Sequence, residues 1–71
     1  MKSYFIEVKK PSGLVTHFGK YFEEMYESLT RLKDSEGFES RQDAENWIPK
    51  VSDYCRQMGM QVASINIVKK E

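Results

Sequence analysis

The sequence predicts an α+β fold, in which an antiparallel sheet packs as a two-layer sandwich against one long helix. Three observations predict it: an alternating hairpin pattern near the start, an amphipathic helical stripe over about 40–58, and an alternating apolar run after Gly59. At 71 residues the chain is expected to form one domain, 1–71. The predicted element order is ββααβ, with βββαβ as the alternative.

Residues 4–9 and 14–18 are predicted to form the two strands of an N-terminal hairpin, because apolar and polar side chains alternate along both. Between them, Pro11 fixes φ and Gly13 permits a positive φ, which indicates a turn. One face of each strand is expected to carry Tyr4, Ile6 and Val8 in the first and Leu14, Thr16 and Phe18 in the second.

Residues 20–33 fit two structures. Phe22, Met25, Tyr26 and Leu29 recur at helical spacing, and no Gly, Pro, Asn or Asp interrupts the segment, so we expect a second helix there. The alternative is a third strand over 26–32, reached through a turn that no residue marks.

The long helix is expected over about 40–58. Ser40 is a suitable N-cap, since its hydroxyl can accept a hydrogen bond from the backbone of Asp43, and Gly59 is a suitable stop. Pro49 lies inside the pattern, but the stripe keeps its phase, which favours a bent helix over a break at Ile48. The stripe consists of Ala44, Trp47, Ile48, Val51, Tyr54, Cys55 and Met58.

Two further apolar features complete the predicted fold. Phe38 is expected to anchor the chain just before the helix. Residues 60–68 are predicted to form the closing strand, with Ile65 and Ile67 on one face, and the sheet is expected to keep one face partly open. An uncovered sheet edge would invite pairing with another chain.

The run LTRLKDSEGFESRQDAENWI, with the helix, Gly59 and strand that follow it, resembles the second half of a SPOR-type peptidoglycan-binding domain. Phe38, Ser40 and Ala44 match that pattern, which covers less than half of the chain. The resemblance implies a strand, in place of a helix, over 26–32. It transfers no binding residue.

Composition narrows the function classes. Eleven basic and eleven acidic residues give a net charge of zero, which disfavours a general nucleic-acid binder. The single cysteine excludes an intramolecular disulfide and a cysteine-cluster metal site. No apolar run approaches the roughly 20 residues that span a membrane, and no hydrophobic leader follows Met1. We therefore expect a cytoplasmic protein without a membrane partner.

Residues that could carry chemistry are few. His17 and Cys55 would have to meet to form a catalytic pair, and a surface histidine and a buried inert thiol are the simpler expectations. The acidic pairs are expected to be solvated. These acidic pairs are Glu23 with Glu24, Asp34 with Glu36, and Asp43 with Glu45. The sequence therefore predicts that the protein is not an enzyme and has neither a cofactor nor a metal site.

The expected function is a small protein-interaction module, an adaptor or regulator of the kind found among phage and bacterial accessory proteins, acting as a homodimer. Large aromatic and methionine side chains on a short chain favour it, although they do not identify the protein partner. The alternative is a nucleic-acid-binding domain, in which lysine-rich strand ends flank an open aromatic sheet face. The candidate surface residues are Tyr4, Phe5, Lys9, Lys10, His17, Lys69 and Lys70.

Overall fold

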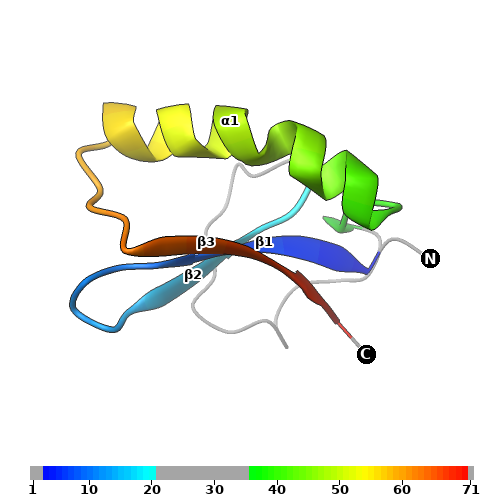
Figure 1. Cartoon of the computed structure of the whole chain (residues 1–71), viewed down its shortest axis with the longest axis horizontal. Helices are drawn as coiled ribbons and strands as arrows, with labels where there is room; N and C mark the ends of the chain where they lie inside the picture. The colour runs from blue at the N-terminus through cyan, green and yellow to red at the C-terminus, as the bar shows by residue number, and fades with distance from the viewer. Residues whose placement is uncertain (1–2, 21–35, 71) are drawn as a thin grey trace.

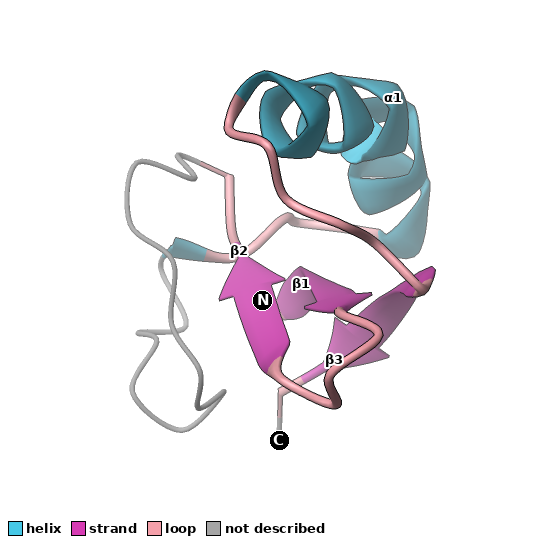
Figure 2. Ribbon diagram, turned by 90° about the vertical axis from the view of Figure 1, so that its left-hand side faces the viewer, coloured by secondary structure: helices cyan, strands magenta, loops and turns pink. Residues whose placement is uncertain are grey.

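The computed structural model describes residues 3–20 and 36–70 and contains three strands and a helix in that part of the chain (Figure 1). The helix lies along one face of the sheet, as both views of the ribbon show (Figure 2). The elements are β1 (Tyr4–Lys9), β2 (Val15–Phe18), α1 (Arg41–Gln57) and β3 (Ser64–Lys69).

The strands form an antiparallel sheet in the order β2-β1-β3, so β1 is central. Ile6 is paired with Phe18 of β2 on one side and with Ile67 of β3 on the other. The predicted three-stranded antiparallel sheet and long helix are confirmed. Residues 21–33 of the predicted second helix (20–33), and the whole of its strand alternative over 26–32, fall outside the described residues.

The hairpin turn follows from its proline and glycine. The N–H of Gly13 donates to the Lys10 carbonyl at 2.9 Å, and Gly13 has a φ of 94°. The N–H of Lys10 donates to the Leu14 carbonyl at 2.8 Å, which closes a three-residue loop with a left-handed glycine at its end. Strand β2 therefore begins at Val15, one residue later than expected.

Helix α1 begins as its capping signal predicts. The Ser40 hydroxyl accepts a hydrogen bond from the N–H of Asp43 at 3.1 Å. The helix runs unbroken through Pro49, so the alternative of a break at Ile48 is wrong. Pro49 and Glu45 are both exposed, so the carbonyl that loses its helical partner lies on the solvent side.

Gly59 ends α1 in a Schellman arrangement. Its φ is 71°, its N–H donates to the Arg56 carbonyl at 3.1 Å, and the N–H of Met60 donates to the Cys55 carbonyl at 2.8 Å. These bonds turn the chain back toward the sheet. Residues 60–63 are used in this return, so β3 begins at Ser64, four residues later than expected.

The core lies between α1 and the sheet. Its fully buried members come from β1, β2, the Phe38 position and the helix, and they are surrounded by partly buried aromatic and aliphatic side chains. The rings of Phe18 and Tyr54 meet edge to face at 5.9 Å, and those of Phe38 and Trp47 lie 6.2 Å apart. The core consists of Ile6, Val8, Phe18, Phe38, Ala44, Val51 and Cys55.

Phe38 anchors the chain before α1, as the sequence predicts. It is 2% exposed, and its backbone exchanges two hydrogen bonds with Tyr4 beyond the end of β2. Beside it, the N–H of Lys20 donates to the Glu36 carbonyl at 2.7 Å. The segment that leads into the helix is therefore bonded to β1 through Phe38 and, through Glu36, to Lys20 just beyond the end of β2.

Within the described ranges, no helix combines the length and the apolar character that crossing a lipid bilayer requires.

Gly19 allows residues 19–20 to approach Glu36 closely because it has no side chain. A Cβ there would overlap the Glu36 carbonyl oxygen and lie 3.2 Å from the Phe5 ring. We expect Gly19→Ala to lower the free energy of unfolding by about 1–3 kcal/mol, because the added methyl group overpacks a closed site. Urea denaturation followed by Trp47 fluorescence measures the change.

Ser12→Ala, in the exposed hairpin turn, is the matched control and should change the free energy of unfolding by less than about 0.5 kcal/mol. Equal stability of the Gly19→Ala protein and the wild type would show that the contact between residue 19 and Glu36 tolerates a side chain.

Candidate interaction surface

The outer edge of β3 presents backbone groups that the described residues do not pair. The N–H of Lys70 donates to the Ser3 carbonyl at 2.7 Å, and these two residues are in register with the β1–β3 ladder. Hydrogen-bonded and non-bonded pairs alternate along an antiparallel ladder. The residues of β3 that direct their N–H and C=O groups outward are therefore Ile65, Ile67 and Lys69.

The side chains of β3 are also only partly covered. In β1, Phe5, Ile6 and Val8 are each 0% exposed, whereas Ile65 and Ile67 of β3 retain intermediate exposure although they lie against the core. Strand β3 thus combines an available backbone edge with apolar side chains that a further strand would cover.

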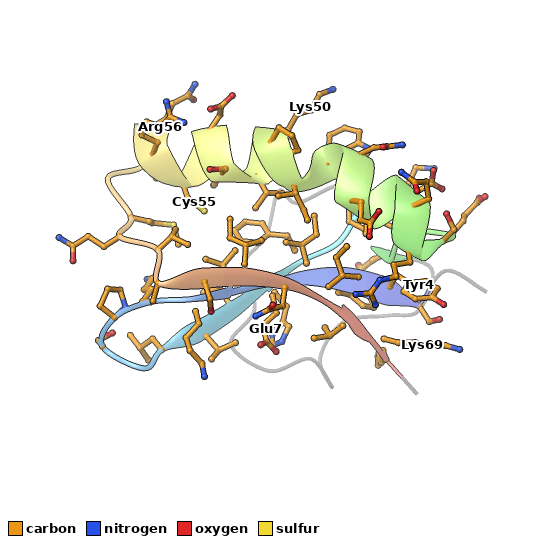
Figure 3. All side chains as sticks on the ribbon, in the orientation of Figure 1. Tyr4, Glu7, Lys50, Cys55, Arg56 and Lys69 are labelled. Carbon is orange, nitrogen blue, oxygen red and sulfur yellow. The ribbon has the colours of Figure 1, made fainter. Side chains whose placement is uncertain are left out.

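Two lysines lie over aromatic rings near this edge and along the helix. The ammonium group of Lys69 is 5.8 Å from the centre of the Tyr4 ring, and that of Lys50 is 4.3 Å from the centre of the Trp47 ring (Figure 3). Tyr4 also packs against the core between the sheet and α1, so it lies on the helix-facing side of the sheet.

The expected lysine cluster does not form. Four lysines would meet only if β1 and the last strand were parallel neighbours, and they are antiparallel. Lys9 lies opposite Ser64 and Lys69 lies opposite Tyr4, so the two lysine groups are at opposite ends of the sheet. Lys10 follows Lys9 and Lys70 follows Lys69, each at its own end.

The residues predicted to form an open aromatic face do not form one. Phe5 is 0% and His17 is 5% exposed, and both lie on the face of the sheet away from α1, while Tyr4 lies on the other face. Only part of that face is open: Asn66 is exposed there. The predicted surface residues are therefore divided between two faces and two ends.

His17 pairs directly across the hairpin with Glu7. Its Nε2 atom lies 3.2 Å from a Glu7 carboxylate oxygen, and the two residues occupy opposite positions in the β1–β2 ladder. The expectation of a histidine on the outer face is correct in the choice of face, but the side chain is buried. This contact is a cross-strand pair that stabilises the hairpin.

Cys55 is separated from this pair by the sheet. It is fully buried between α1 and the sheet, whereas Glu7 lies on the far side (Figure 3). Burial raises the pKa of the Cys55 thiol from its ordinary value, and the positive charge of Lys10 lowers it by a smaller amount. Burial therefore disfavours the thiolate, and the sheet keeps the thiol out of reach of His17 as a base.

The acidic groups of α1 have structural partners. The Glu45 carboxylate pairs with Arg41 at 3.7 Å and the Asp53 carboxylate accepts a hydrogen bond from Arg56 at 3.0 Å, and all four side chains are exposed. Asp43 contributes its backbone N–H to the Ser40 cap. In the described residues no group of three or more His, Cys, Asp or Glu side chains is placed to hold a metal ion.

One end of the molecule exposes three large apolar side chains, two of which, Leu14 and Met58, lie on faces that the sequence predicts to be apolar. Leu14 is 51% and Met58 is 59% exposed, and Val62 is 37% exposed. They lie in the hairpin loop, at the end of α1 and in the α1–β3 connection, which meet at the same end (Figures 1 and 2). For Leu14 and Met58, the signal was their position next to Gly13 and Gly59, where regular elements stop.

The buried thiol leads to a reactivity prediction. Iodoacetamide should modify native Cys55 at pH 8 at least about tenfold more slowly than an exposed thiol, because the group is buried and its pKa is raised. Mass spectrometry over time measures the rate. The matched control is Ser12→Cys in a Cys55→Ala background; equal rates in the two proteins would contradict burial of Cys55.

The Glu7–His17 pair leads to a stability prediction. A double-mutant cycle with Glu7→Ala and His17→Ala should give a favourable coupling of about 0.2–1 kcal/mol, because the side chains are directly opposed. Urea denaturation of the four proteins provides the free energies of unfolding. Additive losses would show that the contact contributes nothing beyond the burial of each side chain.

Neither a protein-family model, nor a curated protein, nor a solved structure matches this chain.

Proposed function

We propose that the chain is a small non-enzymatic protein-interaction module, an adaptor or regulator that acts as a cytoplasmic homodimer. The observation that carries this proposal is the outer edge of β3, where outward backbone groups coincide with the half-covered side chains of Ile65 and Ile67. Edges of this kind bind other strands through main-chain hydrogen bonds.

The separation of the reactive side chains supports a non-enzymatic role. His17 contacts the Glu7 carboxylate on one face of the sheet, and Cys55 is a buried thiol with a raised pKa on the other. A nucleophile needs a base within hydrogen-bond reach, and these two groups lie on opposite sides of β1 and β2. Among residues 3–20 and 36–70, the His17 and Cys55 side chains are therefore not assembled into a catalytic pair, which favours a binding role.

Size and charge support self-association. A 71-residue chain buries only about 60% of its unfolded surface, so a second copy that covers β3 would add to a small core. The net charge is zero, so two copies do not repel each other through their overall charge. The small core and the zero net charge both favour a dimer as the functional oligomeric state.

The oligomeric state tests the proposal. Sedimentation equilibrium over about a hundredfold range of protein concentration should show a monomer–dimer equilibrium, and the urea midpoint should rise with protein concentration, because only folded chains dimerise. A compact monomer with a constant urea midpoint over the whole range would contradict the proposed homodimer.

A further inference from the structure

We infer that β3 pairs antiparallel with β3 of a second copy, with the two-fold axis passing beside Ile67, so that two three-stranded sheets join into one continuous sheet. This inference rests on the proposed homodimer and specifies how it forms. It names the contact, its register and its partner, a second copy of this chain.

The outward backbone groups determine the register. Only Ile65, Ile67 and Lys69 direct N–H and C=O groups away from β1. If Ile67 faces Ile67 of the second copy, Ile65 faces the other copy's Lys69, and every outward residue of both strands is paired. A shift of two residues in either direction leaves some of these groups unpaired.

The side chains are compatible with this register. On the helix-facing side, the two Ile67 side chains meet at the axis, which covers apolar surface that is partly exposed in the single chain. On the other side, Asn66 faces Val68 of the second copy. The two Lys69 residues are four positions apart along the paired strands, about 13 Å, so their charges do not oppose each other directly.

Strand β3 lacks the features that protect an edge from pairing. It has six residues, contains no proline or glycine, and carries its single charged residue, Lys69, at its end. The other outer strand of the described sheet, β2, has four residues. Isologous pairing also closes after two copies, because each β3 edge is used once.

A proline at an outward position tests the pairing without removing a hydrogen bond of the β1–β3 ladder. Lys69→Pro should raise the dimer Kd by about tenfold or more, because each copy loses an inter-chain N–H donor. Lys69→Ala keeps the N–H and removes the same side chain, so it is the matched control against which the tenfold rise in Kd for Lys69→Pro is measured. Sedimentation gives both values, and Trp47 fluorescence checks that each variant folds.

Cysteine cross-linking tests the register, also if the proline variant fails to fold. In a Cys55→Ala background, chains with Asn66→Cys and chains with Val68→Cys are oxidised separately and as a mixture. Asn66 and Val68 of the other copy form a non-hydrogen-bonded pair, whose short separation suits a disulfide. The mixture should therefore form a cross-linked heterodimer, and neither variant alone should cross-link at a comparable rate.

The outcomes separate the two proposals. A wild-type dimer that Lys69→Pro does not weaken, with no cross-linking in the mixture, would overturn pairing through β3 and leave the homodimer standing. Rapid cross-linking of either single variant would place a different residue on the axis and overturn the register. A wild type that stays monomeric over the whole concentration range would overturn both the homodimer and its β3 contact.

Discussion

Strand β1 is the constraint on which the rest of this structure depends, because it is bonded on both edges and buried on both faces. Strands β2 and β3 occupy its two edges, and Phe38 takes the place beside Tyr4 where β2 has ended. Phe5 on one face and Ile6 on the other are both fully buried. A short chain gains most from a strand that contributes core in two directions, since its surface is large relative to its volume.

Helix α1 is held over this strand by signals at both of its ends as well as by its apolar stripe. The Ser40 cap satisfies an N-terminal backbone donor, and the Gly59 turn satisfies carbonyls at the other end. Pro49 is accommodated because it and Glu45, whose carbonyl loses its helical partner, both lie on the solvent-exposed side of the helix. Local backbone chemistry thus fixes where the helix lies on the sheet.

Features set by neighbouring residues could be predicted from the sequence. The hairpin turn, the Ser40 cap, the Gly59 stop and the shared face of Ile65 and Ile67 all depend on short spacings. Features that depend on contacts between residues far apart in the sequence could not be predicted. The burial of His17, for example, depends on which segments of the chain cover that face, and no local pattern reports this.

The meeting of the four lysines at one end of the sheet was mispredicted for the same reason. Lys9 and Lys69 would meet in a parallel arrangement and are separated in the antiparallel one, and an isolated strand pattern carries no information about its direction relative to a distant partner. The β3 edge was foreseen only in general terms, as an unpaired edge. Its outward residues became identifiable once the Ser3–Lys70 hydrogen bond fixed the phase of the ladder.

The pairing of β1 with β3 also has a consequence for biosynthesis. A ribosome delivers β1 early and β3 after α1, so one edge of the central strand stays without its partner while most of the chain emerges. Such long-range closure is slow compared with hairpin or helix formation, and an unpaired central strand is a site for aggregation. Nascent chains stalled before Ser64 should therefore be the form of this protein that most needs a chaperone.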